Sequence, residues 1–131
     1  MTKVTASTAK EKYKTEIKTE KHTIIADEPQ SIGGADLGFN PNELLAASLA
    51  SCTGITLRMY ADRKEWDLEE TMIEVTFDNK SETTETKMTM VIRVFGKLDE
   101  SQRNRLLEIA HNCPIHKLLV NAFPISVVLK D

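Results

Sequence analysis

Charged and uncharged positions are unevenly distributed along this chain. Residues 44–57 contain no charged side chain, although charges are frequent on both sides of them. Asn40, followed by Pro41 and by Glu43 three positions on, forms a capping-box pattern, which predicts a helix that runs from about residue 41 to Lys64. A helix that is apolar all round in its first half needs cover on every side.

Alternating apolar and polar residues predict strands before and after this helix. The predicted strands are a pair within 10–28 and single strands over 72–77, 86–95 and 124–131. The polar segment 78–85 predicts a hairpin loop. A second capping box, at Asp99 and Gln102, predicts a helix over 99–110, and Pro114 predicts a break before a short last helix. The order β-β-α-β-β-α-α-β is typical of an α+β fold with antiparallel sheets.

Length and charge narrow the class of protein. A chain of 131 residues predicts a single domain over 1–131. The net charge of −3 disfavours partnership with nucleic acid or an anionic membrane surface. The first twenty residues lack the apolar stretch of a secretory signal, and residues 44–57 are too few to span a bilayer. We therefore expect a soluble, cytoplasmic protein that contacts no membrane.

The two cysteines are the candidates for chemistry. They are too few for a cysteine-based zinc site, and the three histidines have no metal-ligand spacing, so no metal is expected. Cys52 lies mid-helix on a face that would ordinarily keep a thiol protonated. Cys113 precedes Pro114, where a helix N-cap would stabilise a thiolate. Spacing alone leaves open whether the two are core residues or a redox pair.

Two segments resemble a known family. FNPNELLAASLASCT (39–53) and AHNCPIHKLL (110–119) are similar, in the same order, to the two cysteine motifs of the OsmC/Ohr family of organic hydroperoxide reductases. The ending CPIHKLL resembles the OsmC-like subgroup. The resemblance implies an OsmC-like fold, in which antiparallel sheets surround a buried central helix in an intertwined homodimer.

The resemblance also implies a reaction. Cys52 would attack the peroxide and become a sulfenic acid, Cys113 would condense with it to a disulfide, and a dithiol reductant would restore both thiols. No cofactor is implied. The substrate would be a small hydrophobic hydroperoxide, alkyl or fatty-acid, and the role would be defence against oxidative stress. The helix face around Cys52 would form its pocket, from Leu45, Ser48, Leu49, Thr56 and Met59.

The chain departs from the family at one catalytic feature. The family's active site uses an N-terminal arginine held by a glutamate directly after the motif's proline. Here no arginine precedes Arg58, and Glu43 comes one position later than that glutamate, where it also fits the capping box. Arg58 would point away from Cys52 on the helix, which leaves Arg93, Arg103 and Arg105 as candidates to replace the arginine.

Two other functions stay open. A non-catalytic dimer could bind a small hydrophobic ligand or act as a redox sensor, as the missing arginine suggests. A thiol-based acyl-processing enzyme could use Cys113 with His116.

Overall fold

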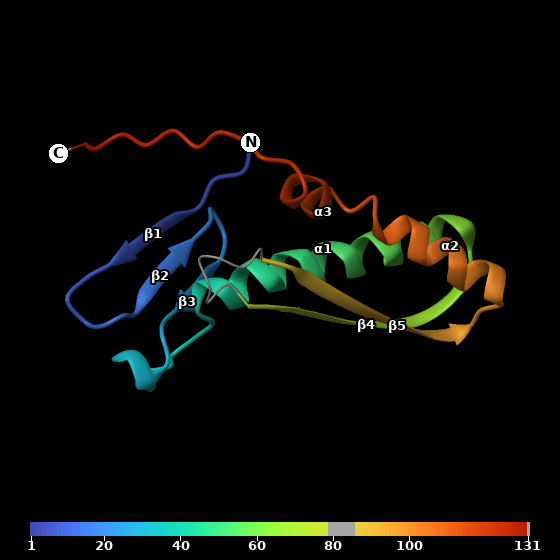
Figure 1. Ribbon diagram of the computed structural model, residues 1–131, viewed down its shortest axis with the longest axis horizontal. Coiled ribbons are helices and arrows are strands. Elements are labelled where there is room, and N and C mark those ends of the chain that lie inside the picture. Colours follow the sequence, from blue (N-terminus) through green and yellow to red (C-terminus); the bar gives the residue numbers. More distant parts are fainter. Residues whose placement is uncertain (79–85, 131) are drawn as a thin grey trace. The chain divides into compact units, whose positions relative to one another are not determined.

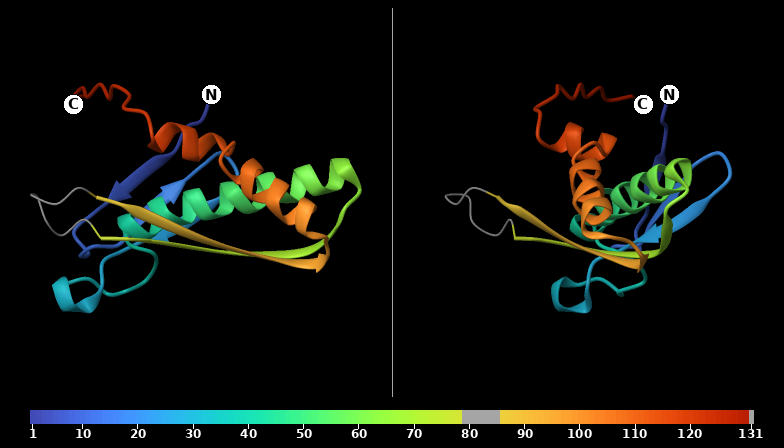
Figure 2. Two further views of the ribbon diagram at one scale, coloured as in Figure 1. Left: turned by 45° about the vertical axis from the view of Figure 1, so that its right-hand side comes forward. Right: turned by 90° about the vertical axis from the view of Figure 1, so that its right-hand side faces the viewer.

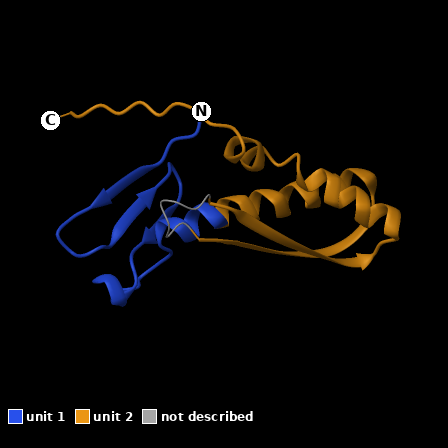
Figure 3. Cartoon of the chain, in the orientation of Figure 1, with its two compact units in different colours: residues 1–46 blue, residues 47–131 orange. Residues whose placement is uncertain are grey.

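The computed structural model describes residues 1–78 and 86–130, which fall into two compact units (Figures 1 and 3). The first unit covers residues 1–46, and the second begins at residue 47. Antiparallel strands and helices build both, so the predicted α+β class with antiparallel sheets is confirmed. The expectation of one domain over 1–131 stays a prediction.

The first unit holds a three-stranded antiparallel sheet in the order β1-β2-β3. Its strands are β1 (Thr5–Thr8), β2 (Thr15–Lys18) and β3 (Thr23–Ala26). The strand pair predicted within 10–28 is confirmed as β2 and β3, which place Ile17 opposite Ile24. The strand β1 was missed because its sequence, TAST, has no apolar alternation and all four residues are exposed.

A buried carboxylate organises the loop that follows β3. Asp27 is almost fully buried, and its oxygens accept backbone N–H hydrogen bonds from Tyr13 at 3.0 Å, Glu28 at 2.7 Å and Leu37 at 3.2 Å. Burial alone would raise the pKa of Asp27, but these N–H groups, with that of Ala35, hold it below its ordinary value. The loop, which includes the short helix η1 (Gln30–Ile32), is thus fixed around one negative charge.

The second unit packs helices against a two-stranded ribbon. Its elements are α1 (Pro41–Lys64), which starts in the first unit, β4 (Asp67–Phe77), β5 (Met88–Lys97), α2 (Glu100–Ala110) and α3 (Pro114–Leu119). The strands β4 and β5 are antiparallel, and α1 and α2 lie on the same face of the ribbon (Figure 2). The hairpin loop predicted over 78–85 lies, apart from Asp78, outside the described residues.

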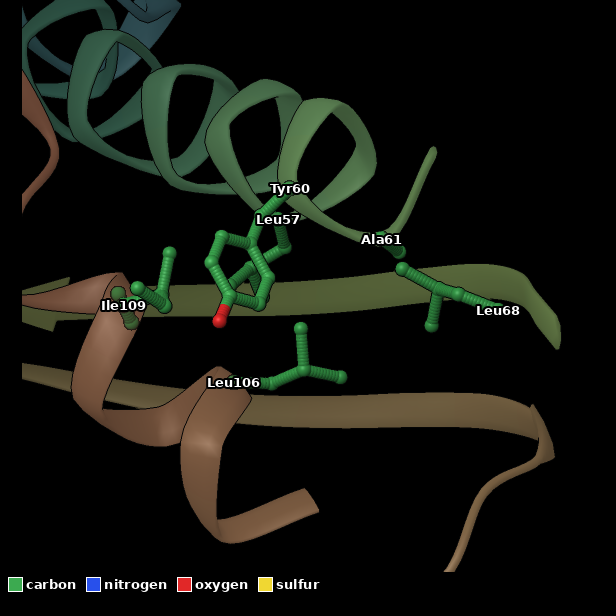
Figure 4. Close-up of a cluster of buried hydrophobic side chains, with 7 residues drawn as sticks. Leu57, Tyr60, Ala61, Leu68, Leu106 and Ile109 are labelled. Atoms are coloured by element: carbon green, nitrogen blue, oxygen red, sulfur yellow. The ribbon is translucent and has the colours of Figure 1, made fainter. Parts of the chain in front are cut away.

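The core of the second unit joins α1, α2 and the start of β4 (Figure 4). Its buried residues are Leu57, Tyr60, Ala61, Leu68, Leu106, Ile109 and Ala110. Both predicted capping boxes precede helices that enter this packing. The Glu43 N–H donates to Asn40 Oδ1 at 2.8 Å and the Asn40 N–H to Glu43 Oε1 at 2.9 Å, and Asp99 and Gln102 bond in the same way.

The expected all-round cover of α1 is not provided by residues 1–78 and 86–130. One face is buried, along Leu49, Thr53 and Leu57, whereas Ile55 is 56% exposed and Met59 59% exposed. The ribbon and α2 cover one face of a helix, and the chain's other described elements in this unit leave these side chains open. An apolar face therefore remains available on α1.

The strand predicted over 124–131 is absent among the described residues. Beyond α3 the chain to residue 130 has no regular structure, and Ile125, Val127 and Leu129 are at least 80% exposed. The alternation that predicted the strand is real, but a strand also needs a neighbouring strand for its backbone hydrogen bonds. No described element of this chain pairs with the segment.

Candidate active site

Cys113 lies at the junction of α2 and α3. It is the N-cap of α3, as its place before Pro114 predicted, and its Sγ accepts the backbone N–H of His116 at 3.5 Å. Proline suits the first helical position because it has no N–H to leave unpaired. The side chain is fully buried. The turn between the two helices therefore holds the sulfur inside the second unit, against backbone donors.

Cys52 meets Cys113 from the middle of α1. The two thiols are within hydrogen-bonding reach of each other, and the Cys52 sulfur also contacts the backbone N–H of Ile115 and the Thr56 hydroxyl. Both cysteines are free thiols, and Cys52 is only half-buried. The structure thus brings together two cysteines that are 61 positions apart (113 − 52), and it leaves Cys52 as the one open to solvent.

The surroundings shift the two thiols in opposite directions. Burial raises the pKa of the Cys52 thiol, and its hydrogen bond to Cys113 raises it further. Burial also acts to raise the pKa of Cys113, but the Cys52 thiol, the His116 N–H, Thr53 and the Ile115 N–H together bring it below its ordinary value. The negative charge of the pair is therefore favoured on Cys113, the buried sulfur.

Thr53 is a site residue that the sequence analysis missed. It is fully buried, and its Oγ1 donates to the Leu49 carbonyl at 2.9 Å while it also contacts the Met90 sulfur and Cys113. The sequence feature that could have indicated Thr53 is a hydroxyl residue directly after the cysteine of the first motif. The N-cap prediction implied backbone N–H donors at Cys113, and the His116 N–H is one of them, whereas the contact of the Ile115 N–H with Cys52 was missed.

The other predicted site residues differ from one another in their contacts and burial. Glu43 holds the cap of α1 with its carboxylate. Thr56 contacts Cys52, and Leu49 is buried beside a groove. Leu45 and Met59 are exposed and are not among the residues that line this groove.

Three of the four arginines considered above have hydrogen-bond partners away from the cysteines. Arg58 forms an ion pair with Asp62 at 3.1 Å and also donates to the Leu68 carbonyl. Arg103 donates to the Val94 carbonyl at 3.2 Å. Arg105 donates to the Tyr60 hydroxyl at 3.0 Å and pairs with Glu108. Arg93 lines a groove with Arg103 against β5 and α2. The strongest influences on the thiols are thus uncharged groups.

Metal-binding clusters and membrane-spanning helices can be assessed for the described residues. Within 1–78 and 86–130, no three His, Cys, Asp or Glu side chains gather in a way that could hold a metal ion. One helix in the same ranges, α1, is long and apolar enough to cross a membrane by length and composition, a test that the core helix of a soluble protein also passes.

The paired thiols and the fold can be set beside known proteins. The family model described as OsmC-like protein matches residues 33–128, which include both cysteines. The chain belongs to the OsmC-like family. No curated protein matches it.

Solved structures of OsmC-like relatives share the architecture. One from Psychrobacter arcticus, named as an osmotic stress induced and detoxification response protein, is 27% identical, with a TM-score of 0.76 over 89% of this chain and 87% of that one. The organic hydroperoxide resistance protein OhrB of Bacillus subtilis is 25% identical, with a TM-score of 0.59 over 88% and 87%. An OsmC-like protein from Mycoplasma pneumoniae, 18% identical, shares the fold with a TM-score of 0.77 over 90% and 86%.

Proposed function

We propose that this OsmC-like protein is a thiol peroxidase that reduces small hydrophobic organic hydroperoxides, in defence against oxidative stress. The observation that carries the proposal is the contact between the half-buried Cys52 thiol and the buried Cys113 thiol. A relative of similar fold is named as an organic hydroperoxide resistance protein, which supports the choice of substrate class.

The proposed reaction has three steps. The Cys52 thiolate attacks the terminal peroxide oxygen, so that an S–O bond forms, the O–O bond breaks and the alkoxide leaves as an alcohol after taking a proton. The Cys113 thiolate then attacks the Cys52 sulfenic acid, forming the disulfide and releasing hydroxide, which is protonated to water. A dithiol reductant restores both thiols and is itself oxidised to a disulfide.

Access and pKa divide the roles between the two sulfurs. Cys52 is the more exposed, so it is the sulfur that a peroxide reaches first. Its raised pKa makes the reactive thiolate scarce at neutral pH, which predicts slow turnover. The lowered pKa of Cys113 suits it to leave as a thiolate when the reductant attacks the disulfide at Cys52.

The assembly and location belong to the same proposal. We propose a homodimer, because Ile55 and Met59 on α1 and the segment from Phe123 to Leu129 are apolar and exposed in this chain. A reducing cytoplasm would keep both cysteines as thiols and would supply the dithiol reductant.

A second function is favoured by the raised pKa of Cys52 and by the engagement of Arg58, Arg103 and Arg105 elsewhere. On this alternative the family fold is kept as a ligand-binding dimer or slow redox sensor, and Cys52 does not turn over peroxide. The two candidates differ in one measurable quantity, which is the rate of hydroperoxide consumption.

The test follows cumene hydroperoxide consumption with a dithiol reductant, alongside intact-protein mass spectrometry. We expect consumption that falls to the background rate in Cys52→Ser, while Ser51→Ala, at the exposed neighbouring position, keeps full activity. Peroxide without reductant should remove both thiol hydrogens from the native protein and produce a Cys52 sulfenic acid in Cys113→Ser. Equal rates for native protein and Cys52→Ser would refute the peroxidase and leave the ligand-binding alternative.

A further inference from the structure

The second unit contains a groove whose lining residues have no role in the proposed thiol reaction. It has a volume of about 700 Å³, within the ~300–1,000 Å³ range of small-molecule sites. It lies between β5, α2 and α3, and Leu49 of α1 forms part of its wall. Neither cysteine lines it.

The walls of the groove suit an alkyl chain. Its apolar lining includes Met88, Met90 and Ile92 from β5, with Leu107 from α2 and Leu119 from α3. Methionine side chains are unbranched and adapt to irregular apolar ligands. Leu107 is 56% exposed and Leu119 38% exposed, so an incoming alkyl chain would gain contact with apolar surface that now faces water.

Among the described residues, the titratable side chains that line the groove are all bases. They are Lys87, just before β5, and His111 and His116, at the junction of α2 and α3. No carboxylate is among the lining residues within the described ranges 1–78 and 86–130. Glu108, on the same helix as Leu107, is paired with Arg105 at 2.7 Å. The described part of the lining therefore offers a positive charge at Lys87 and no carboxylate.

The histidines are oriented by their neighbours. The two rings meet edge to face with centroids 5.5 Å apart, and His111 Nδ1 lies 3.1 Å from the Leu107 carbonyl. Because a carbonyl only accepts hydrogen bonds, Nδ1 is the ring nitrogen that carries the proton in this contact. Lys87 carries an ammonium group on a flexible stem, which makes it the direct partner for an anion.

From this combination we infer that the groove binds an alkyl monocarboxylate, with its chain along the apolar wall and its carboxylate at Lys87. The class follows from a largely apolar lining whose described titratable residues are basic, with Thr86 as an uncharged polar member. The inference is independent of the proposed peroxidase reaction, because neither sulfur lines the groove and the ligand carries no peroxide.

The test measures binding of dodecanoate by calorimetry to the reduced, full-length protein, without peroxide. We expect saturable binding of one dodecanoate per chain and at least ~tenfold weaker binding of dodecanol, since a hydrogen-bonded charge is worth about 1.5–3 kcal/mol. Lys87→Met should weaken dodecanoate binding by a similar factor. Lys97→Met, at the other end of β5 and outside the groove, should not.

Two neighbouring leucines of α3 give a matched control for the apolar wall. Leu119 lines the groove, whereas Leu118 is 50% exposed and does not. Leu119→Glu should abolish dodecanoate binding and Leu118→Glu should leave it within about twofold, since a surface change away from a site usually has an effect within ±0.5 kcal/mol.

Three outcomes would overturn the inference. One is equal affinity for dodecanoate and dodecanol, and another is unchanged affinity in Lys87→Met. The third is absence of dodecanoate binding together with dissociation of a dimer by Leu119→Glu, which would mean that a second copy of the chain occupies the groove. Each is separable from the proposed reaction, because cumene hydroperoxide consumption can be measured on the same samples.

Discussion

Asp27 and Cys113 lie in different units and are held by the same kind of donor, but the two arrangements differ in completeness. The Asp27 carboxylate is surrounded by backbone N–H groups of its own loop. Cys113 accepts backbone N–H hydrogen bonds too, but one of its partners is the thiol of Cys52. Backbone N–H donors stay the same during a reaction, whereas a thiol partner can form a disulfide bond.

The difference separates a structural anion from a reactive one. Asp27 can keep the same hydrogen-bond donors permanently, because its charge only has to hold the loop in place. Cys113 stabilises negative charge in the reduced state through a neighbour that is also its partner for covalent chemistry. A lowered pKa therefore marks both positions, and the identity of the donors distinguishes them.

The largest effect is expected from Asp27→Asn. Asn keeps Oδ1, which accepts from Tyr13 and Glu28, but places an NH₂ group where Oδ2 accepts the Leu37 N–H. Two donors would then face each other in a buried loop. We expect thermal unfolding at pH 7 to begin several degrees lower. Asp99→Asn is the matched control, because Asn also caps helices well and should change little.

The pH dependence of this effect has a defined sign. Because the pKa of Asp27 is lowered in the folded state, its contribution is fully present above the unfolded value of about 3.9 and is lost as the pH falls through the folded value. Denaturant unfolding of the native protein and of Asp27→Asn should therefore converge below about pH 4. A difference between them that grows on acidification would contradict a structural role for the charge.

The next effect concerns the coupling of the two thiols. Cys113→Ala removes the neighbour whose hydrogen bond and charge raise the pKa of Cys52. The pKa of Cys52 should fall, and its iodoacetamide reaction at pH 7 should become severalfold faster. The pH profile of alkylation measures this, with Ser51→Ala as the control on the same helix. An unchanged profile would mean that burial alone sets the pKa of Cys52.

The structural features that depend on local sequence could be predicted from the sequence. The helix over 41–64, the two capping boxes and the alternating strands β4 and β5 each depend on residues close together in the chain. The strand expected over 124–131 is not formed by the described residues 124–130, because alternation describes a surface and not the neighbouring strand that must pair with it.

The sequence predicted only part of the candidate site. Its two cysteines were identified by resemblance to a family, since a separation of 61 positions says nothing about contact. The N-cap donors at Cys113 follow from its place before Pro114, but the Ile115 N–H contacts the Cys52 sulfur only because α3 lies near α1, which the sequence does not show. The groove with Lys87, His111 and His116 was missed for the same reason, as it takes residues from three elements that tertiary structure brings together.

The smallest effect is expected from Thr53→Val, which removes a buried hydroxyl at nearly constant shape. The hydroxyl has one hydrogen, which is donated to the Leu49 carbonyl while Cys113 is a thiol; we expect it to turn to the sulfur on ionisation. Valine cannot do this, so the pKa of Cys113 should rise. Stability should fall by only about 1 kcal/mol, the net worth of one neutral hydrogen bond.

The measurement for Thr53→Val is the rate of disulfide formation with oxidised glutathione as a function of pH. Its midpoint should move upward in Thr53→Val. Thr56→Val is the matched control, because Thr56 acts on Cys52 and should leave the ionisation of Cys113 in place. If both variants kept the native midpoint, Thr53 would be a packing residue. Cys113 would then be held, like Asp27, mainly by backbone donors, and the contrast between the two sites would rest on the Cys52 thiol alone.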